Sequence, residues 1–246
     1  MTKSQKFLLT ISKLQITPPE NIKAIISWID KDQTITFFSW KMFVVKIKNG
    51  ITSFDFNFDT KTANKLISKE IVFLKILTDL KIKFNYLKII PDELLGLFFN
   101  KSSKLGAIIF MKQVNAYFRR KYPSTQTFLL SDLLEENNLN STYQSIFAYV
   151  YKNTDKLVDQ KKMAKEIQFR STYYSLKPLE LKMAHELARK AFALFAAETN
   201  SLFKLEQKGV LKNFVLLSRS ESTNTYKYEF FKYPKNRPIL PKLFVL

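Results

Sequence analysis

The sequence contains no cysteine and a single histidine among its 246 residues. The lack of cysteine excludes disulfides, thiolate nucleophiles and cysteine-ligated zinc or iron–sulfur sites. One histidine cannot build a histidine-rich metal site, and a Ser-His-Asp triad would have to use it. This residue, His185, lies between Ala184 and Glu186 in a stretch with helical spacing, so we interpret it as a structural or surface residue. We therefore predict no metal site.

Glycine is also scarce, and the four glycines are isolated from one another: Gly50, Gly96, Gly106 and Gly209. A phosphate-binding loop or a dinucleotide-binding turn needs closely spaced glycines, because the backbone must approach the phosphates. Neither pattern occurs in its usual form. Nucleotide hydrolysis is therefore not expected.

Carboxylates recur at short spacing, for example as Asp30/Asp32, Asp55/Asp59 and Glu135/Glu136. Such a pair could support metal-assisted or glycosidic chemistry if an apolar cleft held it. Their positions fit a turn, the end of a hairpin and a helix terminus better. We predict that the protein is not an enzyme, with no catalytic residues, no cofactor and no small-molecule substrate.

Long apolar runs are absent as well, since no stretch approaches the 18 or more consecutive apolar residues of a spanning helix. The start, MTKSQKFLLTISKLQITPP, has too short an apolar run for a signal peptide and lacks the Arg-rich and Ser-rich character of a transit peptide. We expect a protein that is not integral to a membrane and that loses no leader.

What the sequence does contain is positive charge, with 40 basic against 21 acidic residues and a formal net charge of +19. Hydrophobic residues make up 46% of the chain, which is enough to bury a core. A surplus of this size concerns partners more than fold, and it favours a polyanion. Nucleic acid and an anionic membrane surface both qualify.

The chain has thirty-four lysines but only six arginines, together with 23 phenylalanines. Arginine is the better phosphate ligand, so this preference is not explained by binding chemistry and indicates an A+T-rich gene. In composition, charge and intact start, over its whole length but in no motif, the chain resembles mitochondrion-encoded ribosomal proteins of divergent protists. This resemblance implies an organelle-encoded protein of the mitochondrial matrix. An A+T-rich bacterium, plasmid or large virus would leave a similar composition.

The first hundred residues predict an α/β domain with a mixed sheet. Residues 6–16 read as a strand, and Thr17 to Glu20 as the start of a helix with isoleucines on one face. Two alternating segments flank Asn49-Gly50, the preferred pair for a two-residue hairpin turn. Asp59 can cap a helix through about Leu80, and residues 82–90 read as another strand.

Residues 101–246 predict a second, mainly helical domain, which makes the fold class α+β. Helices are expected between breaks at 100–104, 123, 137–141, 153–154 and 171–177. A long helix from Pro178 to Gly209 is expected to bury Leu179, Met183, Leu187, Ala191 and Leu194, with a possible break at 199–201. A C-terminal hairpin (210–233) and an irregular tail with two prolines follow.

Basic residues recur beside aromatic ones in three segments: NAYFRRKYP at 115–123, KKMAKEIQFRSTYY at 161–174 and YKYEFFKYPKNR at 226–237. Basic residues in the last turn of a helix also interact favourably with its dipole, so one such segment has two explanations. Three segments favour a surface that binds phosphates and stacks on unpaired bases. The predicted nucleic-acid-binding residues are Lys112, Arg119, Arg120, Lys121, Lys161, Lys162, Lys165, Arg170, Tyr173, Tyr174, Arg219, Lys227, Lys232, Lys235, Arg237 and Lys242.

These features lead to a structural RNA-binding protein of an organelle ribosome, with ribosomal RNA and neighbouring ribosomal proteins as partners. One alternative is a DNA-binding replication or transcription protein, because a long helix, Gly209 and a hairpin could form a winged helix. A second alternative is an accessory subunit of an organelle membrane complex, with lysines on lipid headgroups. The sequence leaves all three open.

Overall fold

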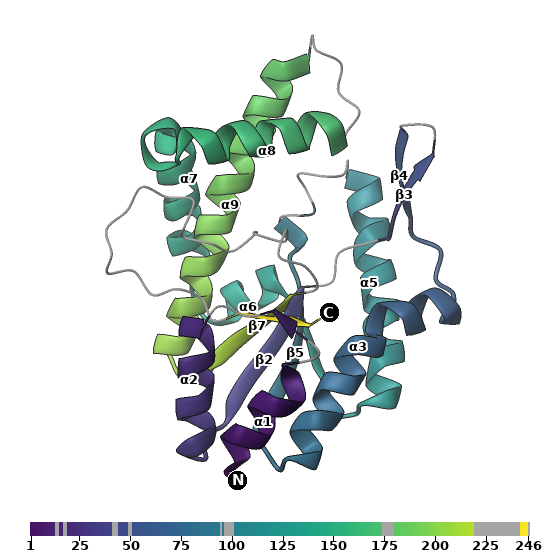
Figure 1. Cartoon of the computed structure of the whole chain (residues 1–246). Coiled ribbons are helices and arrows are strands. Elements are labelled where there is room, and N and C mark those ends of the chain that lie inside the picture. Colours follow the sequence, from purple (N-terminus) through teal and green to yellow (C-terminus); the bar gives the residue numbers. More distant parts are fainter. Residues whose placement is uncertain are drawn as a thin grey trace.

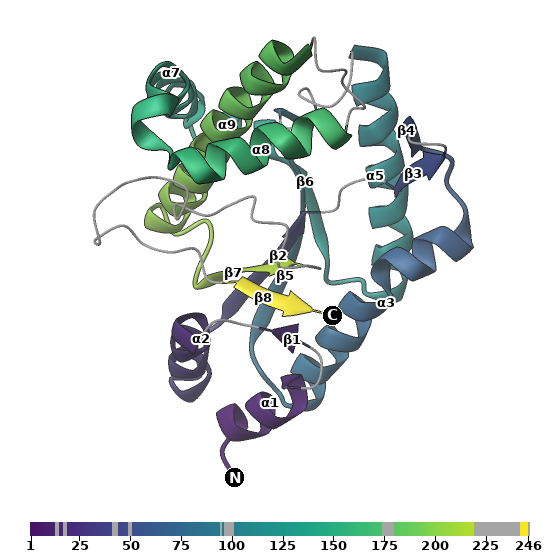
Figure 2. The ribbon, with the colours of Figure 1, turned by 45° about the horizontal axis from the view of Figure 1, so that its top comes forward.

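The computed structural model describes residues 1–12, 15–16, 19–40, 44–48, 51–93, 95, 101–173, 180–218 and 242–245. A six-stranded sheet lies at the centre, in the order β1-β8-β7-β2-β5-β6 (Figures 1 and 2). Its strands are parallel except for β1, which runs antiparallel to β8. The strands are β1 (Gln15–Ile16), β2 (Ile35–Trp40), β5 (Phe84–Ile90), β6 (Gln126–Leu129), β7 (Phe214–Ser218) and β8 (Lys242–Val245).

Helices cover both faces of this sheet. One face packs against α1 (Lys3–Ile11), α2 (Pro19–Asp30), α3 (Thr60–Asp79) and α5 (Lys101–Lys121). The core on the other face is built from α6 (Leu130–Glu136) and α9 (Leu181–Gln207), and it is extended by α7 (Asn140–Leu157) and α8 (Gln160–Tyr173), which pack against α9. Successive strand residues alternate between the two cores, as when Phe37 joins the first and Phe38 the second. The fold is therefore a three-layer mixed α/β arrangement rich in helix.

The order of the five parallel strands follows a doubly wound pattern. From β2 the chain moves outward to β5 and β6, and then returns to the other side of β2 as β7 and β8. Ligands of such sheets bind beyond the carboxyl ends of the strands at the point where the direction reverses, here between β2 and β7. The segments that follow these two strands, 41–43 and 219–241, lie outside the described residues.

Several predicted elements of the first hundred residues are confirmed. The hairpin strands are β3 (Val44–Lys48) and β4 (Ile51–Asp55), whose register pairs Lys48 with Ile51 and so leaves the two residues of the predicted turn between them. Asp59 caps α3 by accepting a hydrogen bond from the Thr62 backbone N–H at 2.8 Å. The predicted helix after Pro19 and the strand at 82–90 correspond to α2 and β5.

The strand predicted for residues 6–16 is wrong for most of its length, because α1 occupies residues 3–11. A capping box starts this helix: the Gln5 backbone N–H donates to Thr2 Oγ1 at 3.2 Å, and the Thr2 N–H donates to Gln5 Oε1 at 2.9 Å. Phe7 and Ile11, four residues apart, are buried on one face. Only the pair Gln15–Ile16 forms a strand.

Two helix breaks predicted from polar residues are wrong for one physical reason. Thr154 Oγ1 donates to the Val150 carbonyl at 2.7 Å, and α7 continues to Leu157. In α9, Thr199 Oγ1 donates to the Phe195 carbonyl at 2.7 Å, and the helix runs through to Gln207. Each hydroxyl donates to a carbonyl of its own helix, so neither threonine interrupts the helix in which it lies.

The buried stripe predicted for the long helix is also out of phase. Met183 is 56% exposed, Leu187 is half-buried and Leu179 lies outside the described residues, whereas Ala191 and Leu194 are buried as predicted. The observed inner face begins with Ala184 and Ala188. Small side chains there let α9 pack closely on its neighbours. The prediction missed this face because it looked for large apolar residues at helical spacing.

The C-terminal predictions need two corrections. The segment 214–218 is a strand, but it pairs in parallel with β2 on one side and β8 on the other, so the hairpin predicted with residues 226–233 is wrong for it. The run FVLL, apolar at every position, is typical of a parallel strand buried on both faces. The tail is not wholly irregular, because residues 242–245 form β8 directly after its prolines.

The central sheet contains strands from both sides of residue 100, where the sequence predicted a domain boundary. Strands β2 and β5 come from before it and β6, β7 and β8 from after it, and β2 pairs directly with β7. The predicted helical middle also contains a strand, β6, next to β5.

Gly209 ends α9 as predicted, with φ of +74°. The Gly209 N–H donates to the Glu206 carbonyl and the Val210 N–H to the Leu205 carbonyl, a Schellman motif. An alanine Cβ would meet no atom within 4 Å, so only backbone strain opposes it. We expect Gly209→Ala to lower the free energy of unfolding by about 1–2 kcal/mol. Urea denaturation checks this, with Gly209→Asn as the control that should cost less, since asparagine tolerates a positive φ better.

Candidate nucleic-acid interface

The first basic cluster lies in the last turn of α5, where Arg119, Arg120 and Lys121 are all exposed. Phe110, Val114 and Phe118 on the opposite side of the helix are buried, as their spacing predicts. The three cations therefore point away from the core at the negative end of the helix dipole, a position that both explanations of this segment require. Lys112, which lies two turns before Arg119 in α5, is exposed as well.

Two tyrosines, Tyr117 and Tyr122, lie between this basic cluster and α3. The ammonium of Lys121 lies 5.3 Å from the centre of the half-buried Tyr117 ring, and the Tyr117 hydroxyl donates to Asn64 Oδ1 of α3 at 3.0 Å. The Tyr122 hydroxyl is 2.9 Å from Thr78 Oγ1. These contacts fix the end of α5 on α3, so the basic side chains project from a held surface. Both tyrosines already have partners within the fold.

The second cluster belongs to α8 and is split by burial. Lys161 and Lys165 are exposed, Lys162 is half-buried and its backbone N–H donates to Asp159 Oδ1 at 3.1 Å. Arg170 is only 2% exposed. Its guanidinium forms an ion pair with Glu166, one turn earlier in α8, with 2.5 Å between Arg170 Nη2 and Glu166 Oε1. Arg170 is therefore part of the packing of α8, and we leave it out of the proposed binding surface.

The described residues do not join the two clusters into one patch. In both overall views the start of α8 lies beside α7, whereas the end of α5 lies beside α3 on the far side of the sheet (Figures 1 and 2). Of the remaining predicted residues, the structure shows only two backbones: Tyr173 ends α8, and Lys242 lies within β8. The others lie outside the described residues: Tyr174, Arg219, Lys227, Lys232, Lys235 and Arg237.

The acidic pairs lie where the sequence suggested. Asp32 is in a turn with φ of 52°, and its carboxylate pairs with Lys83 at 2.5 Å and Lys3 at 3.2 Å. The hydrogen bond from Lys83, followed by that from Lys3, lowers the pKa of the Asp32 carboxyl. Asp59 is the cap of α3. Among the described residues, no group of three or more His, Asp or Glu side chains could hold a metal ion.

One basic residue that sequence reasoning did not single out is Lys88 of β5, which is 1% exposed. Its ammonium pairs with the Glu70 carboxylate of α3 and donates to Ser39 Oγ of β2 at 3.1 Å. The Tyr86 hydroxyl donates to Glu70 Oε2 at 2.5 Å and lies 3.0 Å from Ser39 Oγ. The ring of Phe118 lies 4.5 Å from the ammonium. We call these four polar residues, Ser39, Glu70, Tyr86 and Lys88, the buried polar cluster.

The buried polar cluster connects two parallel strands to a helix beneath the sheet. Each of its members is buried, so it is not accessible to a polyanion. Its only sequence signal is a charged residue at an inward position of a strand. A buried charge needs a partner, but the sequence does not identify which acidic residue supplies it.

No helix within the described part of the chain is long and apolar enough to cross a membrane.

Comparison with known proteins gives a likeness of fold. No model of a known protein family matches the sequence, and no curated protein matches it. Among the solved structures that match is the crystal structure of the PvcA protein from Pseudomonas aeruginosa, with a TM-score of 0.58 and 10% sequence identity. The match covers 100% of this chain and 84% of that chain. At this identity the likeness concerns the fold alone and carries no activity over to this chain.

Proposed function

We propose that the protein is a structural RNA-binding protein of a mitochondrial ribosome, encoded in the organelle and located in the matrix. The observation that carries the proposal is the state of the two described basic clusters. Arg119, Arg120 and Lys121 on α5, and Lys161 and Lys165 on α8, are exposed and form no ion pair with a carboxylate in the described part of the chain. Their charge is available to phosphates.

The separation of the clusters suits a structured polyanion. Two basic surfaces on different sides of one fold can neutralise phosphates from two RNA segments, or from distant parts of one folded RNA. Lysine and arginine on phosphates give affinity that does not depend on base sequence. Such contacts need no turnover and no cofactor.

The DNA-binding alternative rests on a hairpin at 210–233. Of this segment the structure describes β7, which pairs in parallel with β2 and β8, whereas residues 219–233 lie outside the described residues. No observation among the described residues favours this alternative over RNA binding.

The first test is the salt dependence of RNA binding. We expect the purified protein to bind ribosomal RNA fragments with an affinity that falls steeply with salt, with a log–log slope of roughly −0.7 to −0.9 for each phosphate neutralised. Fluorescence anisotropy between about 50 and 200 mM salt measures it. A flat salt response would contradict the proposal.

Fractionation tests the ribosomal part separately. After detergent treatment of mitochondria, we expect the protein to sediment with ribosomal particles and to leave them after RNase digestion. Retention in a detergent-solubilised membrane complex would instead support the second alternative of the sequence analysis.

A further inference from the structure

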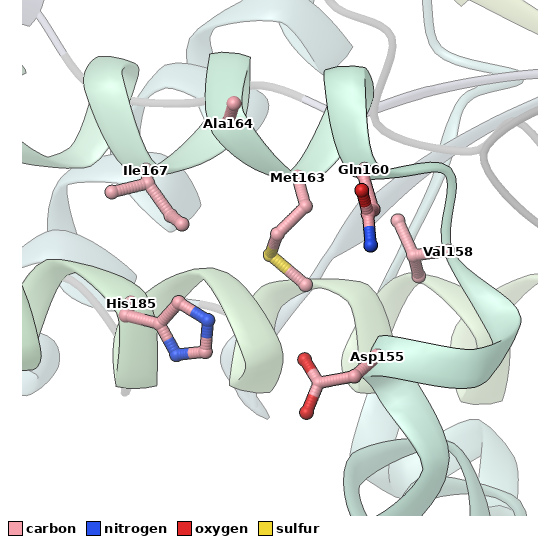
Figure 3. Close-up of a pocket in the computed structure, with 7 residues that line it drawn as sticks. All are labelled: Asp155, Val158, Gln160, Met163, Ala164, Ile167 and His185. Carbon is pink, nitrogen blue, oxygen red and sulfur yellow. The ribbon is translucent and has the colours of Figure 1, made fainter.

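A pocket of about 300 Å³ opens between the end of α7, the first half of α8 and the start of α9 (Figure 3). Val158 and Met163 are buried and Ile167 is half-buried, so they form an apolar floor. Polar groups stand around it: the carboxylate of Asp155, the amide of Gln160 and the imidazole of His185. Figure 3 shows Met163 pointing from α8 toward α9, between Asp155 at one end and His185 at the other.

The local sequence explains why these side chains meet. Gln160, Met163 and Ile167 recur at helical spacing and so share one face of α8. Asp155 lies one turn from the end of α7, and the backbone turns at Val158 before α8 begins at Gln160. The third wall is α9, which brings His185, the histidine that we interpreted as a structural or surface residue, to the pocket.

The lining selects a ligand with flat apolar faces and hydrogen-bond donors along one edge. An ionised carboxylate only accepts hydrogen bonds, so the Asp155 end of the pocket requires donors. Gln160, which lies beside Val158, and His185 at the other end of the pocket can each donate or accept, so the rest of the ligand can carry both donors and acceptors (Figure 3). Guanine fits this pattern, because its N1–H and N2 amino group are adjacent donors that can meet the two oxygens of one carboxylate. Uracil has a single N–H and cannot make both bonds.

Exposed lysines lie close in sequence to pocket residues on all three helices. Lys152 and Lys182 each precede a polar lining residue, Asp155 and His185, by three positions, a spacing that makes side chains neighbours on a helix. On α8, Lys161 directly follows Gln160. All three lysines are exposed. A ligand with a flat base in the pocket and phosphate groups outside it would meet this charge.

We propose that this pocket binds an unpaired guanine of single-stranded RNA, with the neighbouring phosphates on Lys152, Lys161 and Lys182. The inference rests on the proposed RNA-binding function and adds base selectivity to it, at a site separate from the α5 cluster. Recognition of splayed-out bases through their Watson–Crick edge is the common route to sequence preference in RNA binding.

The test compares labelled oligouridylate with the same oligomer carrying one central guanosine, by anisotropy at a single salt concentration. We expect the guanosine oligomer to bind at least about fivefold more tightly, since a bidentate base contact discriminates by about 1–3 kcal/mol. Inosine in place of guanosine removes the N2 amino group and should lose most of this preference. Equal binding of the uridine and guanosine oligomers would overturn the inference but leave the proposed function standing. Binding of neither oligomer, nor of ribosomal RNA, would overturn both.

Asp155→Asn locates the preference. We expect the variant to bind both oligomers equally, because only the carboxylate distinguishes the bases. The matched control is Asp79→Asn, the same change at an exposed position that ends α3. Both aspartates are exposed, so both variants should melt like the parent protein. A guanosine preference that survives in Asp155→Asn would place the base elsewhere and overturn the assignment.

A competition separates two sources of guanine. We expect GMP, and not UMP, to displace the guanosine oligomer, which would show that the pocket takes the base itself. Binding of GMP without any preference among the RNA oligomers would show a free-nucleotide site and would overturn the RNA assignment.

Discussion

Replacement of Glu70 by leucine is expected to lower the free energy of unfolding by about 3–5 kcal/mol, the cost of leaving one member of a buried ion pair without the other. The Lys88 ammonium would keep Ser39 Oγ at 3.1 Å and the Phe118 ring at 4.5 Å, but it would lose the carboxylate. Neither a hydroxyl nor a ring replaces a full negative charge in an interior where water is excluded. Guanidinium denaturation of the parent protein and of Glu70→Leu measures the difference.

The double variant Glu70→Leu/Lys88→Met is the control. Removing both charges takes away the desolvation cost along with the attraction, so we expect it to recover most or all of the lost stability. A loss below about 1 kcal/mol in the single variant would contradict the burial of the pair, since that is the range of exposed pairs. Failure of the double variant to recover would show that Lys88 and Glu70 act mainly through other neighbours.

Replacement of Arg119, Arg120 and Lys121 together by glutamine is expected to lower the affinity for ribosomal RNA and flatten the salt slope by about 2, if each cation contacts one phosphate. The side chains are exposed and their helix is held on α3 by Tyr117 and Tyr122, so the melting temperature should change by only a few degrees. Anisotropy across the salt range and thermal melting measure the two quantities on the same samples.

The control must remove three charges elsewhere. Lysines with contacts inside the fold are unsuitable: Lys3 pairs with Asp32, and Lys208 donates to the Asn137 carbonyl at 2.5 Å. Lys6, Lys23 and Lys31 are exposed on or directly after α1 and α2 and form a better set.

The two explanations of the α5 cluster disagree about these variants. If the cluster only caps its helix, the triple change should cost about 1–2 kcal/mol of stability, and RNA affinity should fall no further than in the control. If it binds phosphates, affinity should fall well beyond the control while stability holds. An affinity loss equal to that of the control would contradict the binding surface.

Local signals in the sequence predicted the elements correctly where a residue type favours a single local structure. An Asn-Gly pair between alternating segments gave the β3–β4 hairpin, Asp59 gave the start of α3, and Gly209 gave the end of α9. Thr154 and Thr199 misled, because a hydroxyl in a helix can either end it or bond back to a carbonyl. Only the surrounding packing decides between the two.

Pairings between distant parts of the chain were out of reach. No residue near position 214 indicates that β7 pairs with β2. An apolar strand of this length is compatible with a hairpin as well as with a parallel sheet. The candidate site shows the same limit. The sequence located the exposed cations of α5 correctly, but it did not reveal that Arg170 turns inward or that Asp155 and His185, thirty residues apart, line one pocket.

The pairing of β2 with β7 also governs the order of events during synthesis. Thr36 meets Phe214, about 180 residues later in the chain, and Gln15 meets Val245. At roughly 5–20 residues per second, a ribosome needs about 9–36 s to make the intervening segment. During that time one edge of β2, with its sequence ITFFSW, has no strand to cover it. An uncovered apolar edge can pair with other chains, so the nascent protein passes through an interval in which a chaperone would protect it from aggregation.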